Sequence, residues 1–273
     1  MTRHAEQNPS RVRIGTSGWS YPDWVGPFYP PGTASSDFLG YYAGQFDIVE
    51  VDSTYYRPPS RAMVVNWAKR TPERFQFAVK APSTITHEKV LVDCAKDWQD
   101  FTAALQPLGP KLHSVLLQFG YFNRKAFAGP AQFFERLGAF LARNDRGIRL
   151  AVEIRNKAWL VDDYFELLRT YGAATAVADH VWMPPPERLL TEVDVFTGDF
   201  VYLRLIGDRQ GIEELTTTWS EVVVDRSERL TALADPIRRL GRRGEVVLFA
   251  NNHFAGHAPA TCRQLESLIA SRR

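Results

Sequence analysis

The chain has 273 residues, which suits one barrel-sized domain and is too short for a barrel with a substantial second domain. Lysine and arginine total 33 against 31 for aspartate and glutamate, and the resulting net charge of +2 provides no overall field for binding polyanions or membranes. No apolar stretch reaches transmembrane length and the segment 1–11 lacks the apolar core of a signal peptide, so we expect a cytoplasmic protein without membrane attachment.

Short runs rich in Val, Ile, Leu and Phe recur along the chain, and each has the length of a strand that is buried on both faces. In chain order they are Arg13 to Thr16, Ile48 to Asp52, Phe75 to Lys80, Ser114 to Phe119, Ile148 to Arg155, Ala173 to Asp179, Phe200 to Leu205 and Glu245 to Ala250. Helix-like patterns lie between them at Ser36 to Phe46, Arg61 to Arg70, Asp97 to Leu105, Ala131 to Arg143, Asp163 to Tyr171, Ser227 to Leu240 and Pro259 to Ser271. The Pro-rich stretch from Met183 to Pro186 leaves room only for a short sixth helix, from Glu187 to Thr191.

The alternation of strands and helices predicts right-handed crossovers and a parallel sheet. Eight such units favour a TIM-type (β/α)8 barrel over an open, doubly wound sheet. We therefore predict an α/β chain with a single TIM-barrel domain over residues 13–273 and an irregular sixth helix. Residues 1–12 are expected to form a disordered or loosely held N-terminal tail.

Nearly every predicted strand stops on a residue that can do chemistry, and TIM barrels hold their active sites at these carboxyl ends. The residues are Glu50, Asp52, Lys80, Gln118, Glu153, Arg155, Asp179, Arg204 and the cluster Asn251, Asn252 and His253. Residues two apart share one face of a strand, and large aliphatic residues suit the face that packs on helices. This parity points Glu153 and Arg155 inward in the fifth run, and Tyr202 and Arg204 inward in the seventh.

The same parity directs four further side chains toward the barrel axis: Lys80, Gln118, Asp179 and Asn251. A buried ion without a partner costs on the order of several kcal/mol, so such a ring of charges predicts a site or a network that supports one. An alternative stays open, in which Glu153 and Arg155 form an ion-paired structural plug.

The strand ends also carry recurrent motifs. They are Gly15-Thr-Ser-Gly-Trp-Ser-Tyr21, Glu50-Val-Asp-Ser-Thr-Tyr-Tyr56, Phe77-Ala-Val-Lys-Ala81 with Ile85-Thr-His87, Leu117-Gln118-Phe119, Ala151-Val-Glu-Ile-Arg155 with Trp159, Tyr202-Leu-Arg-Leu-Ile-Gly207, and Phe249-Ala-Asn-Asn-His253 with Gly256 and Ala258. In this order, from about Arg13 to Leu268, they closely resemble the YecE-like proteins, a family catalogued as domain of unknown function 72. The resemblance implies a TIM barrel loosely similar to the xylose isomerase and endonuclease IV type, and it implies no particular reaction. One departure is Ile206, which stands where relatives usually have a His before the glycine.

Aromatic residues crowd the loops after the strands, and aromatic faces beside a polar pocket suit a sugar ring or a nucleobase. Candidates for contact with a ligand are Trp19, Tyr21, Tyr55 and Trp159, and the alternative for these residues is a hydrophobic lid over the barrel. His87, in the loop after Lys80, is an acid–base candidate because imidazole titrates near neutrality.

A phosphate site is predicted between the loops after the seventh and eighth strands, where TIM barrels often hold phosphate at a helix N-terminus. This part of the chain offers Gly207, Asn251, Asn252, Gly256 and a helix start near Ala258. Arg204 and Lys80 can supply positive charge. The alternative is that the asparagines only tie loops together.

Metal binding is a weaker hypothesis. Side chains suited to Mn, Mg or Zn are Glu50, Glu153, Asp179 and His253. His253 and His257 have an HxxxH spacing, but Gly256 and Pro259 argue against one helix across both. Cys94 and Cys262 stand in no CxxC or Cys/His ligand spacing, which is typical of a reducing compartment. No metal ligand is assigned, no cofactor is identified, and a divalent metal stays an alternative.

These residues favour an enzyme, of undecided reaction class, acting on a small polar, anionic substrate, phosphorylated or sugar-like, at the C-terminal mouth of the barrel. Acid, base and electrostatic catalysis is assigned to Glu50, Lys80, His87, Glu153, Arg155 and Asp179. Substrate binding is assigned to Trp19, Tyr21, Tyr55, Gln118, Trp159, Tyr202, Arg204, Asn251, Asn252 and His253. The alternatives are a metal-dependent phosphodiesterase or nuclease acting on nucleic acid, by analogy between barrels, and a non-catalytic metabolite-binding protein.

Overall fold

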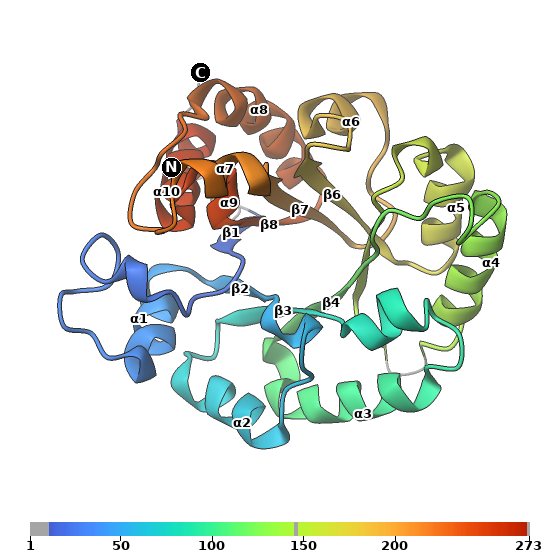
Figure 1. Cartoon of the computed structure of the whole chain (residues 1–273), viewed down its shortest axis with the longest axis horizontal. Coiled ribbons are helices and arrows are strands. Elements are labelled where there is room, and N and C mark those ends of the chain that lie inside the picture. The colour runs from blue at the N-terminus through green and yellow to red at the C-terminus, as the bar shows by residue number, and fades with distance from the viewer. Residues whose placement is uncertain (1–10, 145–146, 272–273) are drawn as a thin grey trace, which may run out of the picture.

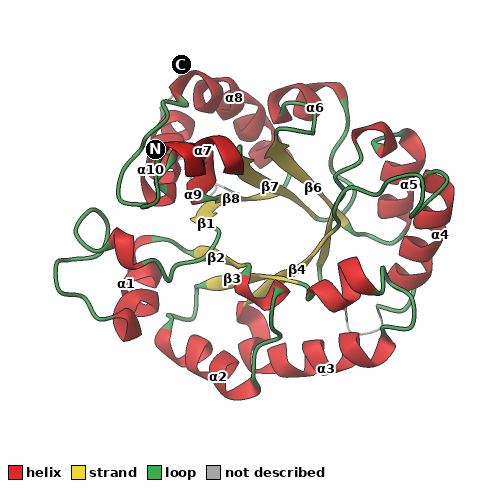
Figure 2. Cartoon of the chain, viewed as in Figure 1, coloured by secondary structure: helices red, strands yellow, loops and turns green. Residues whose placement is uncertain are grey.

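Eight strands alternate with helices around one axis in the computed structural model, which describes residues 11–144 and 147–271 (Figure 1). The strands are β1 (Val12–Thr16), β2 (Ile48–Val51), β3 (Gln76–Lys80), β4 (Leu112–Gln118), β5 (Leu150–Glu153), β6 (Ala174–His180), β7 (Phe200–Gly207) and β8 (Glu245–Ala250). Hydrogen-bonded neighbours are parallel, in the order β1-β8-β7-β6-β5-β4-β3-β2. The predicted TIM-type barrel is confirmed, with strands inside and helices outside (Figure 2).

β1 and β2 are the two end strands of the sheet, and a glycine allows them to lie close together. A Cβ on Gly15 would lie 2.1 Å from the carbonyl oxygen of Ile48, which is far shorter than van der Waals contact. The hydroxyl of Tyr42 links the two strands, because it accepts from the backbone N–H of Thr16 at 2.8 Å and donates to the Ile48 carbonyl at 3.2 Å. A buried side chain thus adds hydrogen bonds at a seam where the strands share only one isolated β-bridge in the described part of the chain, between Ser17 and Glu50.

Alternate residues of the strands fill the interior of the barrel with side chains of unequal size. The interior cluster consists of Ile48, Ala78, Leu116, Ala151, Ala174, Ala176, Phe200, Tyr202, Val247 and Phe249. Small residues on β6 lie beside bulky residues on β7, with Ala176 paired to Tyr202 in the register of the two strands. The alanines therefore make room for the aromatic rings of β7.

The helices surround the strands and follow them in sequence. They are α1 (Phe38–Gln45), α2 (Arg61–Arg70), α3 (Ala95–Leu105), α4 (Pro130–Leu141), α5 (Asp162–Thr170), α6 (Pro186–Glu192), α7 (Arg209–Leu215), α8 (Ser227–Arg243), α9 (Asn252–Ala255) and α10 (Ala258–Ala270). The short sixth helix is confirmed as α6, which begins at Pro186, the last of three consecutive prolines. The sequence analysis did not predict α7 and α9, of seven and four residues, because segments this short show no helical periodicity.

Some element boundaries differ from those predicted. β5 ends at Glu153, so Arg155 lies in the following loop and not in a strand. β1 begins at Val12, inside the predicted tail, and the part of that tail before residue 11 lies outside the described residues. Within residues 11–144 and 147–271, no helix has the length and apolarity needed to cross a membrane.

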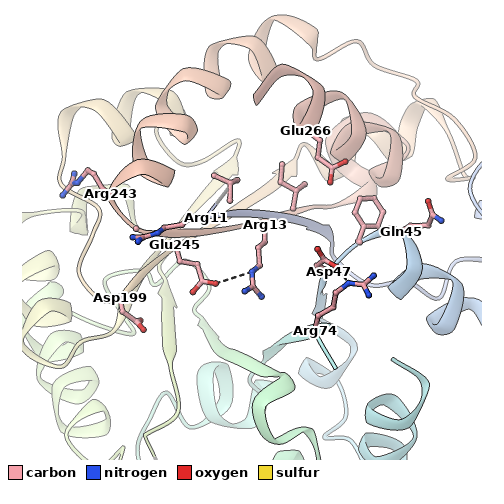
Figure 3. Close-up of a pocket in the computed structure, with 13 residues that line it drawn as sticks. Arg11, Arg13, Gln45, Asp47, Arg74, Asp199, Arg243, Glu245 and Glu266 are labelled. Atoms are coloured by element: carbon pink, nitrogen blue, oxygen red, sulfur yellow. Dashed lines mark hydrogen bonds and ion pairs between the residues drawn. The ribbon is translucent and has the colours of Figure 1, made fainter. Parts of the chain in front are cut away.

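A polar cavity of about 730 Å³ opens at the end of the barrel where the strands begin (Figure 3). Its charges compensate one another, since Arg74 pairs with Asp47 at 2.9 Å and Arg13 lies 3.6 Å from Glu245. Glu245 also binds Arg149 at 2.8 Å. This face of a TIM barrel contributes to stability, whereas chemistry gathers at the opposite face. The arrangement favours a structural role for this cavity, despite its size.

Candidate active site

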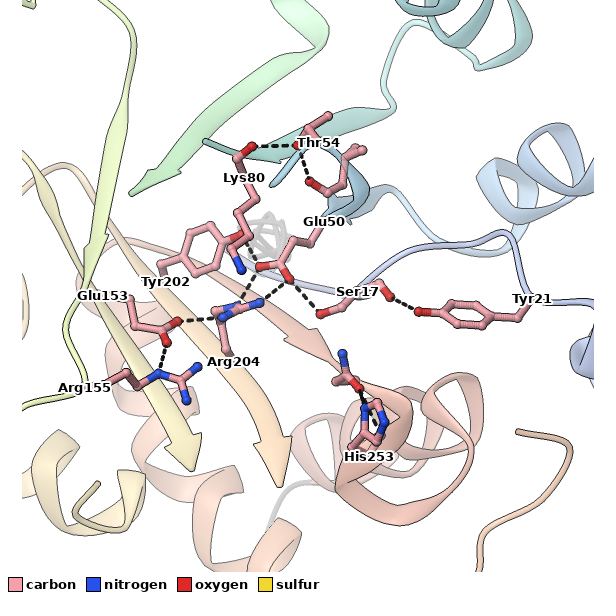
Figure 4. A network of polar contacts seen from close by, with 12 residues as sticks. Ser17, Tyr21, Glu50, Thr54, Lys80, Glu153, Arg155, Tyr202, Arg204 and His253 are labelled. Carbon is pink, nitrogen blue, oxygen red and sulfur yellow. Dashed lines mark hydrogen bonds and ion pairs between the residues drawn. The ribbon is translucent and has the colours of Figure 1, made fainter. Parts of the chain in front are cut away.

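A buried arginine joins two glutamates at the carboxyl ends of the strands (Figure 4). Arg204 of β7 donates to both carboxylate oxygens of Glu50 on β2, at 2.8 Å from Nε and 2.7 Å from Nη2. Its Nη1 donates to Glu153 of β5 at 2.8 Å. Glu153 also accepts from Nε of Arg155, in the loop after β5. The network therefore connects β2, β7 and β5, and its three central side chains belong to residues that are at most 4% exposed.

Two hydroxyl groups complete the surroundings of Glu50. Ser17, just after β1, donates to one carboxylate oxygen at 2.8 Å, and Tyr202 of β7 donates to the other at 2.7 Å. An isolated β-bridge between Ser17 and Glu50 holds the two backbones together. Each oxygen of Glu50 thus accepts two hydrogen bonds, which fixes this carboxylate in one orientation. Sequence reasoning did not select Ser17, although it stands directly after a predicted strand.

Ion pairs outweigh burial in setting the charge of the two glutamates. Burial alone raises a carboxyl pKa, but the guanidinium of Arg204 and its hydrogen bonds hold the pKa of Glu50 below its usual value. Against the same burial, Arg155 and Arg204 lower the pKa of Glu153 to about 2. Both carboxylates are therefore ionised at neutral pH, with their oxygens bound to donors. This geometry favours a positioning role for Glu50 and Glu153 over the general-base role predicted from the sequence.

Lys80, the last residue of β3, lies at the same mouth (Figure 4). Its amino group has no hydrogen-bond partner in the described part of the chain, and Nζ lies 4.1 Å from the ring centroid of Tyr55. Burial and the positive charge of Arg204 lower the pKa of Lys80 from 10.5 to about 8, although carboxylates lie nearby. The hydroxyl of Thr54 fixes the strand end by donating to the carbonyl oxygen of Lys80 at 2.6 Å.

His87 adjoins Tyr55, and the two rings meet edge-on at a centroid distance of 5.0 Å. Its Nδ1 lies 2.8 Å from the hydroxyl of Thr86. Its Nε2 faces the loop after β4, where a Cβ on Gly120 would come within 3.3 Å. Burial, assisted by the charge of Lys80, lowers the pKa of His87, so the ring is mostly neutral at pH 7. Lys80, Tyr55 and His87 therefore form one contiguous group.

Asp179 faces the helices and not the barrel axis, so its predicted inward orientation is wrong. Its carboxylate pairs with Arg229 of α8 at 3.0 Å. The inward positions of β6 belong to alanines such as Ala176, because Tyr202 of β7 fills the space beside them. Asp179 is therefore outside the network, and the catalytic role assigned to it has no geometric basis.

His180, the residue after Asp179, lies near the network instead. Burial, together with the charge of Arg155, lowers the pKa of His180 to about 4. Its Nδ1 accepts from the backbone N–H of Trp182 at 3.2 Å, and the two rings lie 5.2 Å apart. Sequence reasoning did not select His180, although its position at a strand end was a usable signal.

Some of the aromatic residues predicted to contact a ligand pack in the hydrophobic core, and others lie at the mouth of the barrel. Trp159 is 7% exposed and lies in a cluster of phenylalanines, and Trp19 packs edge-on against Trp67 at 5.7 Å. The hydrophobic-lid alternative therefore describes Trp19 and Trp159. The hydroxyl of Tyr21 donates to a backbone carbonyl of the β1 loop at 3.0 Å. Tyr55 alone among the four contacts Lys80.

The asparagines of the predicted phosphate site accept hydrogen bonds from the backbone at helix N-termini. Asn251 accepts from the backbone N–H of His253 at 3.0 Å, and Asn252 accepts from the N–H of Ala258, the first residue of α10, at 3.0 Å. The ring of His253 is held between Asn251 at 2.7 Å and Glu213 of α7 at 3.1 Å. These contacts use donors that an anion would need. They favour the alternative in which the asparagines tie loops together.

Two more polar side chains lie at the strand ends. Gln118 of β4 donates to the carbonyl oxygen of Phe119 at 2.7 Å. Asp52 lines a cavity of about 240 Å³ between the loops that follow β1 and β2. Burial and the neighbouring Glu50 raise the pKa of Asp52. Asp52 was among the predicted strand-end residues, but no role was assigned to it.

The side chains considered as metal ligands are engaged elsewhere. In the described ranges, no group of three or more His, Cys, Asp and Glu side chains is arranged to hold a metal ion. Each of the candidates forms an ion pair or a charged contact with another side chain: Glu50, Glu153, Asp179 and His253. The residues present therefore do not fit a metal centre of the predicted composition.

Comparison with known proteins identifies the family. Residues 13–273 match the family described as Protein of unknown function DUF72. The chain belongs to this family. UPF0759 protein YunF of Bacillus subtilis (strain 168) is 33% identical over 165 residues, which cover 57% of this chain and 54% of YunF. UPF0759 protein YecE of Escherichia coli (strain K12) is 34% identical over 107 residues, or 39% of this chain and 37% of YecE. The matched segments thus span about half or less of these relatives.

Solved structures of DUF72 proteins share the whole barrel. The DUF72 family protein from Thermotoga maritima MSB8 is 30% identical, with a TM-score of 0.75, and the match covers 95% of this chain and 99% of that one. The DUF72 family protein from Enterococcus faecalis V583 is 18% identical, with a TM-score of 0.66, and the match covers 96% and 99% of the two chains. The family resemblance predicted from the strand-end motifs is therefore confirmed.

Proposed function

We propose that this DUF72 protein is an enzyme that acts on a small, polar, anionic substrate at the C-terminal mouth of its barrel, with Lys80 exchanging a proton with that substrate. The observation that carries the proposal is the half-buried Lys80 amine, with no hydrogen-bond partner among the described residues and a pKa near 8. Such a pKa leaves roughly a tenth of the amine unprotonated at pH 7, against fewer than about one in a thousand for an ordinary lysine. Perturbed amines of this kind concentrate at functional sites.

The arginine network supports this role by holding positive charge in fixed positions. Glu50 and Glu153 orient Arg204, and the charge of Arg204 in turn lowers the pKa of Lys80. Arg155 binds Glu153 through Nε, and its two terminal nitrogens have no partner in the part of the chain that the structure describes. Cations that are oriented before the substrate arrives stabilise negative charge that develops during the reaction.

Asp52 belongs to the same charged group as Lys80, because the charge of each influences the pKa of the other. Its pKa is raised by burial and by Glu50, whereas that of Lys80 is lowered. We assign proton removal to the neutral amine of Lys80, with Asp52 and the neutral ring of His87 beside it.

A ligand screen followed by turnover assays tests the proposal. Thermal shifts of the full-length protein are recorded with panels of phosphorylated metabolites, sugars and carboxylates, and each stabilising compound is assayed for turnover. With such a compound, Lys80→Met is expected to lower kcat by roughly 10²- to 10⁴-fold, which is the range of general acid–base catalysis. Lys69→Met on α2, an exposed lysine, is the matched control and should leave kcat unchanged.

Either of two outcomes would contradict the proposal. Turnover by Lys80→Met at the rate of the unmodified protein would remove Lys80 from the chemistry. A ligand that stabilises the protein and is never converted would identify a non-catalytic metabolite-binding protein.

A further inference from the structure

A cavity of about 640 Å³ lies between the loops that follow three neighbouring strands. Tyr121 belongs to the loop after β4, Arg155 and Lys157 to the loop after β5, and Trp182 to the loop after β6, with Arg188 added by α6. Because these loops leave the carboxyl ends of β4, β5 and β6, the groove adjoins the mouth that holds the Arg204 network. Its volume lies within the roughly 300–1,000 Å³ of ordinary ligand sites.

The groove carries cations whose binding groups are largely unused. None of its lining residues is acidic. Arg188 binds Glu192 through Nε at 2.9 Å, and Arg155 binds Glu153 through Nε, so the terminal nitrogens of both side chains have no partners among the described residues. The exposed amino group of Lys157 has no partner there either. Three cations that meet in one concave site favour an anion with several oxygens.

Exposed aromatic rings form the other part of the groove. Trp182 and Tyr121 are each 61% exposed, and their ring centroids lie 6.4 Å apart. The Trp182 segment is held by His180, whose Nδ1 accepts from the Trp182 backbone N–H at 3.2 Å. An exposed indole on a backbone segment that is held in this way offers a stacking surface.

We propose that this groove binds a mononucleotide, with its base against Trp182 and Tyr121 and its phosphate against Arg155, Lys157 and Arg188. A nucleotide joins a flat aromatic ring to a compact dianion, which are the two features that this groove can bind. The net charge of +2 and a groove bounded by three loops favour a single nucleotide over a nucleic acid chain. This inference rests on the proposed function, because Arg155 belongs both to the groove and to the network beside Lys80.

Isothermal titration calorimetry of the full chain with adenosine 5′-monophosphate, adenosine and ribose 5-phosphate tests the proposal. We expect the monophosphate to bind with a lower Kd than either of its halves. Trp182→Ala should raise the Kd for the monophosphate about fivefold or more and leave that for ribose 5-phosphate unchanged. Lys157→Gln should raise the Kd for both phosphates by roughly two- to fivefold and leave that for adenosine unchanged.

Matched variants control for folding and for overall charge. Trp182→Phe keeps an aromatic ring and is expected to restore most of the affinity, and Lys69→Gln on α2 changes the net charge as Lys157→Gln does but should not alter any Kd. Since Trp182 and Lys157 are exposed, melting curves followed by circular dichroism should match the unmodified protein.

Three results would overturn the proposal. They are a monophosphate Kd no lower than those of adenosine and ribose 5-phosphate, a Trp182→Ala variant with unchanged affinity, and tighter binding of a 5′-phosphorylated oligonucleotide, which would assign the groove to nucleic acid. Calorimetric binding requires no turnover. A failure of the Lys80 chemistry is therefore distinguishable from a failure of the nucleotide groove.

Discussion

Arg204 is the residue on which both buried glutamates depend. Removal of one member of a buried ion pair costs about 3–5 kcal/mol, because the remaining charge has no partner. We expect Arg204→Met to lower the free energy of unfolding by about that amount in urea titrations at pH 7, since Glu50 loses its paired cation and Glu153 keeps only Arg155. Arg188→Met, which breaks an exposed pair with Glu192, is the control and should cost less than about 1 kcal/mol. A similarly small loss for Arg204→Met would contradict the network.

Lys80 should affect stability in the opposite direction. Its folded pKa of about 8 lies below the unfolded value near 10.5, so the unfolded chain binds more protons at this residue between those pH values. The contribution of Lys80 to stability therefore rises with pH through that window and is unfavourable below it. Lys80→Met should raise the free energy of unfolding at pH 7 by roughly 1–3 kcal/mol, and this gain should shrink by pH 10.5. Chemical denaturation at pH 7, 9 and 10.5 measures it, and a variant that is less stable at pH 7 would disprove the sign.

At the scale of elements, the seam between β1 and β2 is the most sensitive point of the barrel. Gly15→Ala would place a methyl group 2.1 Å from the carbonyl oxygen of Ile48. This clash can be relieved only by moving the backbone of one of the two strands. We expect thermal and urea unfolding to show a loss of about 3 kcal/mol or more, in the range of strongly disruptive substitutions. Gly44→Ala in α1 meets nothing within 4 Å and should instead be neutral or stabilise by up to about 1 kcal/mol. Equal losses of stability for the two substitutions would mean that Gly15 of β1 does not lie against Ile48 of β2.

Strand parity predicted the inward residues wherever bulky aliphatic residues marked the outer face. In β7, Val201, Leu203 and Leu205 alternate with Tyr202 and Arg204, and Arg204 indeed meets Glu50 across the barrel. Parity was misapplied on β6, where the sequence contains only small residues at the inward positions and Asp179 was taken as a polar strand end. The ring of Tyr202 on β7 explains those alanines, and this contact between two strands is not visible in the residue pattern of β6 alone.

The loops at the strand ends could be predicted only in part. Asn252 caps α10 by accepting a hydrogen bond from the backbone N–H of Ala258. This contact depends on the four-residue helix α9, which begins at Asn252. Such a short helix leaves no periodic signal, so the sequence could not distinguish a cap from an anion ligand. The lowered pKa of Lys80 could not be predicted from the sequence either, because it arises from burial and from Arg204, a residue on another strand.

At the scale of the whole molecule, the two ends of the barrel hold separate charge networks. At the end where the strands begin, the hydrogen bond with His113 and the charge of Arg149 outweigh burial and lower the pKa of Glu245 to about 2. Glu245→Gln should therefore reduce stability, by about 1–3 kcal/mol in urea unfolding. The Kd for adenosine 5′-monophosphate should not change, because the groove lies at the opposite end. A Kd raised more than about fivefold would show that the two ends are coupled.

A reactive amine at the mouth of the barrel is what the proposed chemistry requires of Lys80. Competitive acetylation of the intact protein from pH 6 to 11, followed by peptide mass spectrometry, measures the titration of each lysine in the same sample. We predict that the labelling of Lys80 rises with a midpoint near pH 8, whereas the exposed Lys69 titrates near the ordinary value of about 10.4. A Lys80 midpoint indistinguishable from that of Lys69 would contradict the account.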